Sequence, residues 1–369
     1  MYNYDVWAKA SSGRHDAPYF QHQVFFKIYL MKVLFVCSGN SSNFPIVPFI
    51  QSQGESLKDL GAKVDYFPVK GKGILGYIKS GLKIRKFLKS NNYDIIHAHF
   101  TLSGWSAVIG ARKTPVILSL MGSEVHGNVA GNNALNLKSR FYQILTYLIQ
   151  PFVAAIISKS ENIEKHVYLK SKSKILPNGV NTDLFRPTTN DYRKELGLAP
   201  EKVYVLFLGN REKPIKNFSL AQKAVESLNV PNVELINPYP LTHSDVPKYL
   251  NSVNVLVVPS LMEGSPNVVK EAMACNCPIV ATNVGDIRWV MGDTEGCFLS
   301  SFSSKEFAKQ LKRAIEFSEV NGRTNGEQQI AELGLRSESI ANRLIDIYTS
   351  VHAGSFKIKR SSHQELIES

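Results

Sequence analysis

The chain has 369 residues and a hydrophobic share of 44%, more apolar surface than one hydrophobic core uses. Its four cysteines show no paired framework, which excludes a disulfide-stabilised scaffold, and Cys275 and Cys277 are too close together for a zinc half-site. We therefore expect two domains with buried, reduced thiols, as in cytosolic proteins.

The formal net charge of +12 lies in one part of the chain. Residues 31–175 contain 19 Lys and Arg against 7 Asp and Glu, whereas residues 176–369 contain 21 against 22. A positive field in the first half predicts an anionic partner there: a membrane surface, a polyphosphate lipid or a nucleic acid. A nucleic acid is the weakest of these, because the basic excess lacks interleaved aromatic side chains and a recognition-helix motif.

Residues 1–30 are polar and irregular, without the basic start, apolar run and cleavage site of a secretory signal. Residues 33–37 form a continuous apolar run, so the segment 31–37 is typical of a buried first strand. We expect Met31 to be the natural start. The alternative is that residues 1–30 form a genuine N-terminal extension.

Strand and helix patterns alternate from residue 31 onward. They predict strands at 32–37, 63–67, 94–98, 115–120 and 154–158, and helices at 45–60, 74–90 and 103–112. Such alternation predicts a parallel, doubly wound sheet. The apolar run at 141–157 is interrupted by Pro151, so we expect a core helix leading into a strand and not a membrane span.

A second alternating unit follows a segment rich in turn formers. It predicts strands at 203–208, 233–237, 253–258, 278–281 and 297–299, and helices at 303–320 and 335–352. We therefore expect domains at 31–175 and 176–335, a closing helix at 336–352 that could pack back on the first domain, and a flexible tail at 353–369. Two facing sheets of this kind bind ligands in a shared crevice at their carboxyl ends.

Two glutamates, Glu263 and Glu271, flank a predicted helix start that follows a buried strand. Gly264, Ser265 and Asn267 offer backbone N–H groups there, and helix starts attract anions. Because eight residues span about two helical turns, both carboxylates can face one cleft. The pattern predicts a site for a phosphorylated, polyhydroxylated ligand. The alternative is an acidic helix start that complements its own dipole.

The turn after the strand at 203–208 carries Arg211, Lys213 and Lys216 at the carboxyl end of a predicted sheet. Fixed cations at such a place stabilise a leaving diphosphate more in the transition state than in the ground state. A solvated basic turn is the alternative.

The runs 262–282 and 209–218 resemble the retaining glycosyltransferases of the GT-B fold, in particular the family 4 group. This resemblance implies an α/β protein with two facing Rossmann-like, doubly wound domains and an interdomain cleft. The first domain is expected to bind the acceptor and the second the nucleotide-sugar donor. It also implies that no metal and no other cofactor is needed, because protein cations hold the donor diphosphate.

The resemblance assigns roles to single residues. Arg211 and Lys216 match the positions that hold the diphosphate. Glu271 matches the carboxylate that accepts hydrogen bonds from the ribose hydroxyls. Glu263 faces the donor sugar, where we expect it to position the sugar and stabilise charge rather than to act as a nucleophile. Further donor contacts are expected from Gly264, Ser265, Asn267, Gly209 and Asn210.

In the first domain, His97 and His99 point the same way at the end of a strand, where they could bind a metal or contact the acceptor. Two histidines without a third ligand make a poor metal site, and one of them could be purely structural. Gly39 and Asn40 resemble the family's first loop, whose backbone approaches the diphosphate or the acceptor.

Many relatives carry His-Gly-x-Asp beside the reacting centre. Here Met121 occupies the histidine position and Glu124 replaces the aspartate. Methionine cannot move a proton, so His126, Glu124 or the leaving phosphate must do so.

Residues 74–89 carry five cations, with Ile74, Ile78 and Leu82 at four-residue spacing. A basic amphipathic helix of this kind fits contact with anionic lipid head groups. An ordinary surface helix that packs on its own sheet is the alternative.

We therefore expect a cytoplasmic glycosyltransferase, peripherally associated with the inner face of the membrane. It would move a hexose or N-acetylhexosamine from a UDP- or GDP-linked donor to a lipid-linked or saccharide acceptor in surface polysaccharide biosynthesis. The alternatives are a nucleotide-sugar epimerase and a catalytically inactive protein that binds sugar nucleotides.

Overall fold

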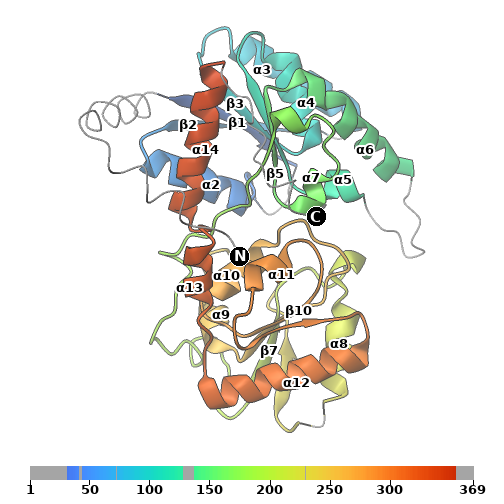
Figure 1. Cartoon of the computed structure of the whole chain (residues 1–369), viewed down its shortest axis with the longest axis vertical. Helices are drawn as coiled ribbons and strands as arrows, with labels where there is room; N and C mark the ends of the chain where they lie inside the picture. The colour runs from blue at the N-terminus through green and yellow to red at the C-terminus, as the bar shows by residue number, and fades with distance from the viewer. Residues whose placement is uncertain (1–30, 41–43, 72, 128–136, 229, 355–369) are drawn as a thin grey trace, which may run out of the picture.

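The computed structural model describes residues 31–40, 44–71, 73–127, 137–228 and 230–354. It contains two parallel sheets, each in a domain of its own, one above the other in Figure 1. The predicted architecture of two doubly wound α/β domains is confirmed. The expectations for residues 1–30 and for the tail from residue 355 onward lie outside the described residues.

The first sheet has six strands in the order β2-β1-β3-β4-β5-β6. They are β1 (Lys32–Ser38), β2 (Lys63–Val69), β3 (Ile95–His99), β4 (Val116–Leu120), β5 (Ala155–Ser158) and β6 (Ser173–Ile175). The helices of this domain are α2 (Pro48–Asp59), α3 (Gly73–Phe87), α4 (Thr101–Gly110), α5 (Ser123–His126), α6 (Leu137–Ile149) and α7 (Glu161–Glu164).

Side-chain alternation along β1 explains how helices cover both faces of this sheet. Val33 and Phe35 belong to the core that includes residues of α2, whereas Leu34 and Val36 belong to the core under α3, α4 and α6. Strands β3, β4 and β5 are buried along their whole length, as is usual for central parallel strands.

The second sheet has five strands in the order β11-β10-β9-β7-β8. They are β7 (Val203–Phe207), β8 (Val233–Ile236), β9 (Val255–Val258), β10 (Ile279–Thr282) and β11 (Cys297–Ser300). Its helices are α8 (Phe218–Glu226), α9 (Val246–Ser252), α10 (Asn267–Ala274), α11 (Ile287–Met291), α12 (Ser304–Asn321) and α13 (Gly326–Glu332).

The last described helix, α14 (Ser337–His352), returns to the first domain and lies against α2 (Figure 1). The backbone N–H of Val180 donates to the carbonyl of Leu335, and the N–H of Ser337 donates to the carbonyl of Val180, where the two crossings between the domains run side by side. Tyr348 of α14 is fully buried, and its hydroxyl lies 2.6 Å from Nδ1 of His97. The two domains are therefore joined both by the chain crossing and by a helix that completes the first core.

Candidate functional site

A pocket of about 220 Å³ lies between the two domains. On the first-domain side its wall includes Met121, His126 and Lys159, which follow strands β4 and β5. On the second-domain side it includes Lys216 and residues 262–265. The carboxyl ends of both sheets thus meet at one site, as expected for facing α/β domains.

The two domains approach each other closely at a pair of glycines. A Cβ atom on Gly264 would lie 2.8 Å from the carbonyl oxygen of Met121 and 2.9 Å from Cδ1 of Ile163. Opposite, Gly122 has a φ of +124°, which side chains rarely adopt. Gly264 is therefore required by the close approach of the two domains, and Gly122 by its backbone conformation.

Lys216 and Glu263 form an ion pair across the pocket wall, with 2.6 Å between Nζ and Oε1. Lys216 belongs to the short 3₁₀ turn at Pro214–Lys216. The backbone N–H of Leu261 donates to the carbonyl of Ile215, and the Asn217 amide donates to the carbonyl of Pro259. These bonds hold the basic turn against the segment that carries Glu263.

Helix α10 begins at Asn267 without a side-chain cap, so its first N–H groups face the pocket region unpaired by a capping residue. Lys270, inside the helix, is buried and donates to the carbonyl of Asn178 and to Oγ of Ser265. Burial lowers the pKa of Lys270 to about 8. This lysine ties the interdomain segment to the helix start.

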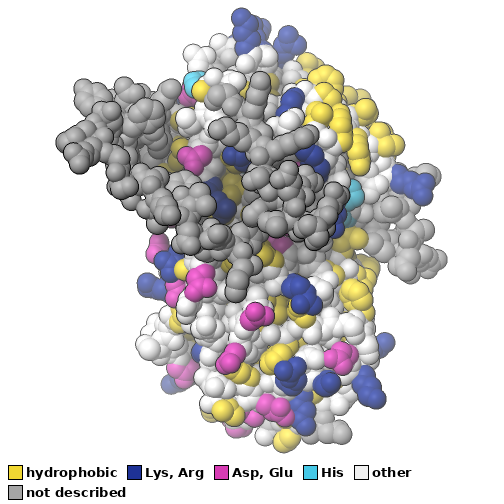
Figure 2. Space-filling model, in the orientation of Figure 1, with side chains coloured by type: hydrophobic (Ala, Val, Ile, Leu, Met, Phe, Trp, Pro, Cys, Tyr) yellow, Lys and Arg dark blue, Asp and Glu magenta, His cyan; other side chains and the backbone are white. Residues whose placement is uncertain are grey.

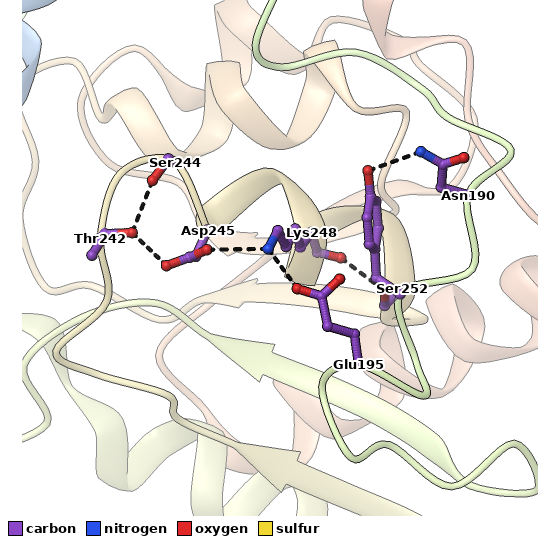
Figure 3. A network of polar contacts seen from close by, with 8 residues as sticks. Asn190, Glu195, Thr242, Ser244, Asp245, Lys248 and Ser252 are labelled. Carbon is purple, nitrogen blue, oxygen red and sulfur yellow. Dashed lines mark hydrogen bonds and ion pairs between the residues drawn. The ribbon is translucent and has the colours of Figure 1, made fainter.

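Glu271 lies one helical turn beyond the pocket wall. Its Oε1 is 3.1 Å from Nε2 of His243, whose ring lies 5.1 Å from that of Phe185. His243 sits in the 242–245 turn, where the Thr242 hydroxyl contacts Ser244 and Asp245 (Figure 3). The sequence analysis missed His243, because a single histidine in a turn carries no pattern.

Figure 3 shows how the turn that carries His243 is braced from neighbouring elements. Lys248 of α9 pairs with Asp245 at 3.5 Å and with Glu195 of the preceding loop. Its carbonyl accepts a hydrogen bond from the Ser252 hydroxyl. The turn is therefore anchored at the start of α9, which keeps His243 next to Glu271.

His97 and His99 differ from the expectation of an acceptor-side role. Both are fully buried, with His97 bonded to Tyr348 and Ser119, and His99 bonded to Gln53. Burial keeps the pKa of each histidine well below its ordinary value, so both are neutral. They form part of the core between β3 and α14 and do not line the pocket.

Glu124 also has a structural role in this structure. Its carboxylate accepts hydrogen bonds from the N–H groups of Met121 and Gly122, at 2.9 and 3.1 Å, and is buried. Burial raises the pKa of Glu124 despite these bonds. His126 does line the pocket, and burial, together with His166, lowers the pKa of His126 to about 4.

Several predicted site residues lie outside the pocket wall. Arg211 is exposed on the basic turn, while Gly209 and Asn210 precede it. The Asn40 side chain exchanges two 2.9 Å hydrogen bonds with the backbone of Gly71, which joins the first loop to the loop before α3. Gly39, next to it, donates its N–H to Val69.

Lys159 is a pocket residue that the sequence analysis did not identify. It directly follows the buried strand β5 and is 1% exposed. A charged residue immediately after a mostly apolar strand was the available signal, since ligand sites lie at strand carboxyl ends.

A larger groove of about 970 Å³ lies between α2, residues 181–184 and the start of α14. It includes His243 but neither glutamate of the predicted pair. Across the described ranges, no three His, Cys, Asp or Glu side chains gather as a potential metal site. None of the helices described is both long and apolar enough to cross a membrane.

Comparison with curated proteins gives relatives of modest identity. The chain is 28% identical to Bacillus subtilis TuaC, whose name assigns it to teichuronic acid biosynthesis, over 60% of this chain and 61% of that protein. It is 24% identical to the Escherichia coli UDP-Gal:alpha-D-GlcNAc-diphosphoundecaprenol alpha-1,3-galactosyltransferase, over 66% of this chain and 72% of that protein. The match therefore spans less than two thirds of TuaC.

Solved structures share the fold. Sucrose-phosphate synthase from Thermosynechococcus elongatus matches with a TM-score of 0.72 at 18% identity, covering 88% of this chain and 100% of that one. Anabaena Alr3699/HepE in complex with UDP matches with a TM-score of 0.66 at 16% identity, covering 87% and 100%. The predicted GT-B fold is confirmed.

Family comparison covers both domains. Residues 32–184 match the family described as Glycosyltransferase Family 4, and residues 193–316 match the one described as Glycosyl transferases group 1. These matches do not favour the epimerase alternative. The chain belongs to the group 1 glycosyl transferases of glycosyltransferase family 4.

Proposed function

We propose that this protein transfers a sugar from a nucleoside-diphosphate donor to an acceptor in polysaccharide or lipid-linked saccharide biosynthesis. The observation that carries the proposal is the interdomain pocket, where Lys216, Glu263 and the start of α10 meet. A cation, a carboxylate and free helix N–H groups are the groups that a sugar diphosphate needs.

In this proposal the start of α10 and Lys216 hold the diphosphate. The bond between the anomeric carbon and the phosphate oxygen breaks, and negative charge accumulates on the leaving diphosphate. A fixed ammonium and the helix N–H groups stabilise that charge more in the transition state than in the ground state. Arg211 contributes only if the basic turn moves inward when the donor binds, because its side chain is exposed.

Glu271 binds the ribose of the donor. Its carboxylate already accepts from His243, and a ribose hydroxyl replaces or joins that donor. The UDP complex of Alr3699/HepE supports a nucleoside diphosphate as the ligand class. Both UDP- and GDP-linked donors remain candidates.

We further propose that the configuration at the anomeric carbon is retained. Glu263 then positions the sugar and stabilises positive charge near the ring, rather than attacking it. Its ion pair with Lys216 fits this role, because a carboxylate held by an ammonium is a weak nucleophile. The acceptor proton passes to the leaving phosphate or to His126, which is neutral at neutral pH and lines the pocket.

We propose that transfer needs no divalent metal, since Lys216 and the helix start supply the positive charge. Activity should then survive a chelator. The matched variants are Lys216→Met and Lys213→Met, since both lysines belong to the basic turn but only Lys216 lines the pocket.

A membrane surface is the proposed location of the acceptor. Exposed cations on α3 accompany the exposed apolar residues Ile74, Leu75, Ile78 and Leu82. Helix α6 adds a second apolar stripe at Phe141, Ile144, Tyr147 and Leu148, each at least 40% exposed. Figure 2 shows hydrophobic side chains gathered over this side of the first domain. A basic, partly apolar face fits an anionic bilayer at the cytoplasmic side.

The test is a transfer assay on the purified chain. UDP- and GDP-hexoses are offered with a polyprenyl-diphosphate-linked sugar as acceptor, with and without a chelator, and the released nucleotide and the product configuration are measured. The proposal expects acceptor-dependent release that resists the chelator, and a loss of about 10²- to 10³-fold in kcat for Lys216→Met but not Lys213→Met. Absence of acceptor-dependent release from every donor would contradict it.

A further inference from the structure

Lys159 presents a buried cation to the pocket without a partner. The residue is 1% exposed, forms part of the pocket wall, and its Nζ has no hydrogen-bond partner among the described residues. Burying an ammonium in this way is unfavourable unless a counter-charge is supplied. No carboxylate of the described residues is hydrogen-bonded to this ammonium.

The strand register explains why a lysine at this position reaches the pocket. Leu120 of β4 pairs with Ser158 of β5, so Met121 and Lys159 are the next residues along two neighbouring strands. Met121, which cannot transfer a proton or bind an anion, thus lies beside Lys159, which can do both. The lysine occupies the first-domain wall, opposite Lys216.

The other charges near Lys159 do not neutralise it. Lys216 is already paired with Glu263, and Lys270 is bonded to a carbonyl and a hydroxyl. His97 and His99, behind the lysine, are neutral, and their pKa values are lowered further by its charge. Among the residues that line the pocket, Lys159 is therefore the cation that no carboxylate pairs with. The carboxylate of Asp286 interacts electrostatically with Lys270.

We propose that Lys159 binds the diphosphate of the donor from the first-domain side and takes up a proton as the donor binds. This inference rests on the proposed function and adds a donor contact from the domain expected to bind the acceptor. Asn178 supports it, because its Oδ1, also in the pocket wall, is buried without a donor and would accept a sugar or ribose hydroxyl. A ligand with phosphate oxygens and hydroxyls satisfies both groups.

Protonation of Lys159 gives the proposal a distinct pH signature. Burial and the nearby charge of Lys270 lower the pKa of Lys159 to about 7. A bound diphosphate raises that pKa, so the contribution of Lys159 to affinity is constant below pH 7, and affinity falls by up to about tenfold per pH unit above it. A window from about pH 7 to about pH 8.5 avoids titration of a terminal phosphate, whose pKa is about 6, and of the nucleobase, which ionises above this window.

The experiment is calorimetric titration of wild type, Lys159→Met and Lys165→Met with UDP and GDP. Lys165 is an exposed lysine on the same segment and serves as the control. Lys159→Met should weaken nucleotide binding at pH 7 by about 10- to 100-fold. The difference in affinity between wild type and this variant should become smaller as the pH rises. Titration in two buffers of different ionisation enthalpy should show that protons are taken up when the nucleotide binds near pH 8. Lys159→Met should take up fewer protons than wild type, and the uptake that remains in this variant belongs to Lys270.

Thermal unfolding of the Lys159→Met variant distinguishes a role of Lys159 in binding from a role in folding. Below pH 7 the lysine is charged in both the folded and the unfolded chain, so the folded state bears the full cost of burial; above pH 7 the folded state releases the proton and the cost shrinks. Without a nucleotide, Lys159→Met should therefore unfold at a higher temperature than wild type, most clearly at pH 6. Added UDP or GDP should raise the unfolding temperature of this variant less than that of wild type.

The outcomes distinguish the two proposals. Wild-type binding that Lys159→Met retains, with the same pH dependence, would overturn the role of Lys159 and leave the donor site intact. Folded wild type that binds neither nucleotide would overturn both. A loss of affinity confined to a phosphorylated acceptor would also overturn the donor contact proposed for Lys159.

Discussion

The ammonium of Lys216 lies 2.6 Å from the carboxylate of Glu263, so the cation that the second domain places in the pocket wall is paired with a carboxylate. A donor diphosphate must compete with Glu263 for this lysine. The proposed mechanism therefore gives the two residues opposite effects on diphosphate affinity and requires both for transfer.

Replacement of Glu263 by Gln should separate binding from catalysis. The variant frees Lys216, so UDP or GDP binds as tightly as to wild type or more tightly, while kcat falls by about 10²- to 10³-fold because charge near the sugar is no longer stabilised. Calorimetry and a transfer assay measure the two quantities. Glu212→Gln, an exposed glutamate of the same basic turn, is the control. A parallel loss of nucleotide affinity and kcat would argue against this division of roles.

Tyr348→Phe tests whether His97 is structural. The substitution removes the hydroxyl 2.6 Å from His97 Nδ1 and leaves a buried nitrogen unpaired, which should lower the free energy of unfolding by about 1 to 3 kcal/mol. Urea unfolding measures the loss, and kcat of the folded variant should stay within about twofold of wild type. Tyr168→Phe, at a half-exposed tyrosine, should change neither. A folded Tyr348→Phe enzyme with strongly reduced kcat would instead indicate that the contact between His97 and Tyr348 supports catalysis.

Fold and site were predictable from the sequence to different degrees. The sheets follow from long apolar runs that alternate with helical periodicity, whereas β6 and α13 are too short to carry such a pattern. Glu263, Gly264, Ser265 and Asn267 were found because they are contiguous. Lys159 and His243 are single polar residues on distant segments. The position of Lys159 directly after a buried strand was its one local signal, and His243 carries none.

The histidines show a second limit. Alternation along β3 correctly predicts that His97 and His99 share a face of the sheet, but not what covers that face. The cover is α14, whose Tyr348 is 251 residues away from His97 in the chain. Burial by a helix so distant in sequence decides between a cleft histidine and a core histidine.

Membrane contact should depend on the apolar stripe of α6. Ile144→Asp and Leu148→Asp, at side chains 54% and 55% exposed, place carboxylates where an anionic bilayer would lie. We expect the double variant to lose most of its binding to vesicles containing anionic lipid in a sedimentation assay, with its fold unchanged. Val320→Asp, at an apolar residue of α12 that is 84% exposed, is the matched control in the other domain. Equal binding by both variants would exclude α6 from the contact.

The most direct test of the donor site is calorimetric binding of UDP and GDP to wild type, Glu271→Ala and Glu271→Gln, with the fold of each checked by circular dichroism. At least one nucleotide should bind wild type, and loss of the charge-assisted bonds to the ribose should weaken that binding by about 10- to 100-fold. The corresponding deoxynucleotide should bind wild type weakly, and its affinity should fall little further in the two Glu271 variants. Unchanged affinity in folded Glu271→Ala, or no binding of either nucleotide to wild type, would contradict the donor site described here.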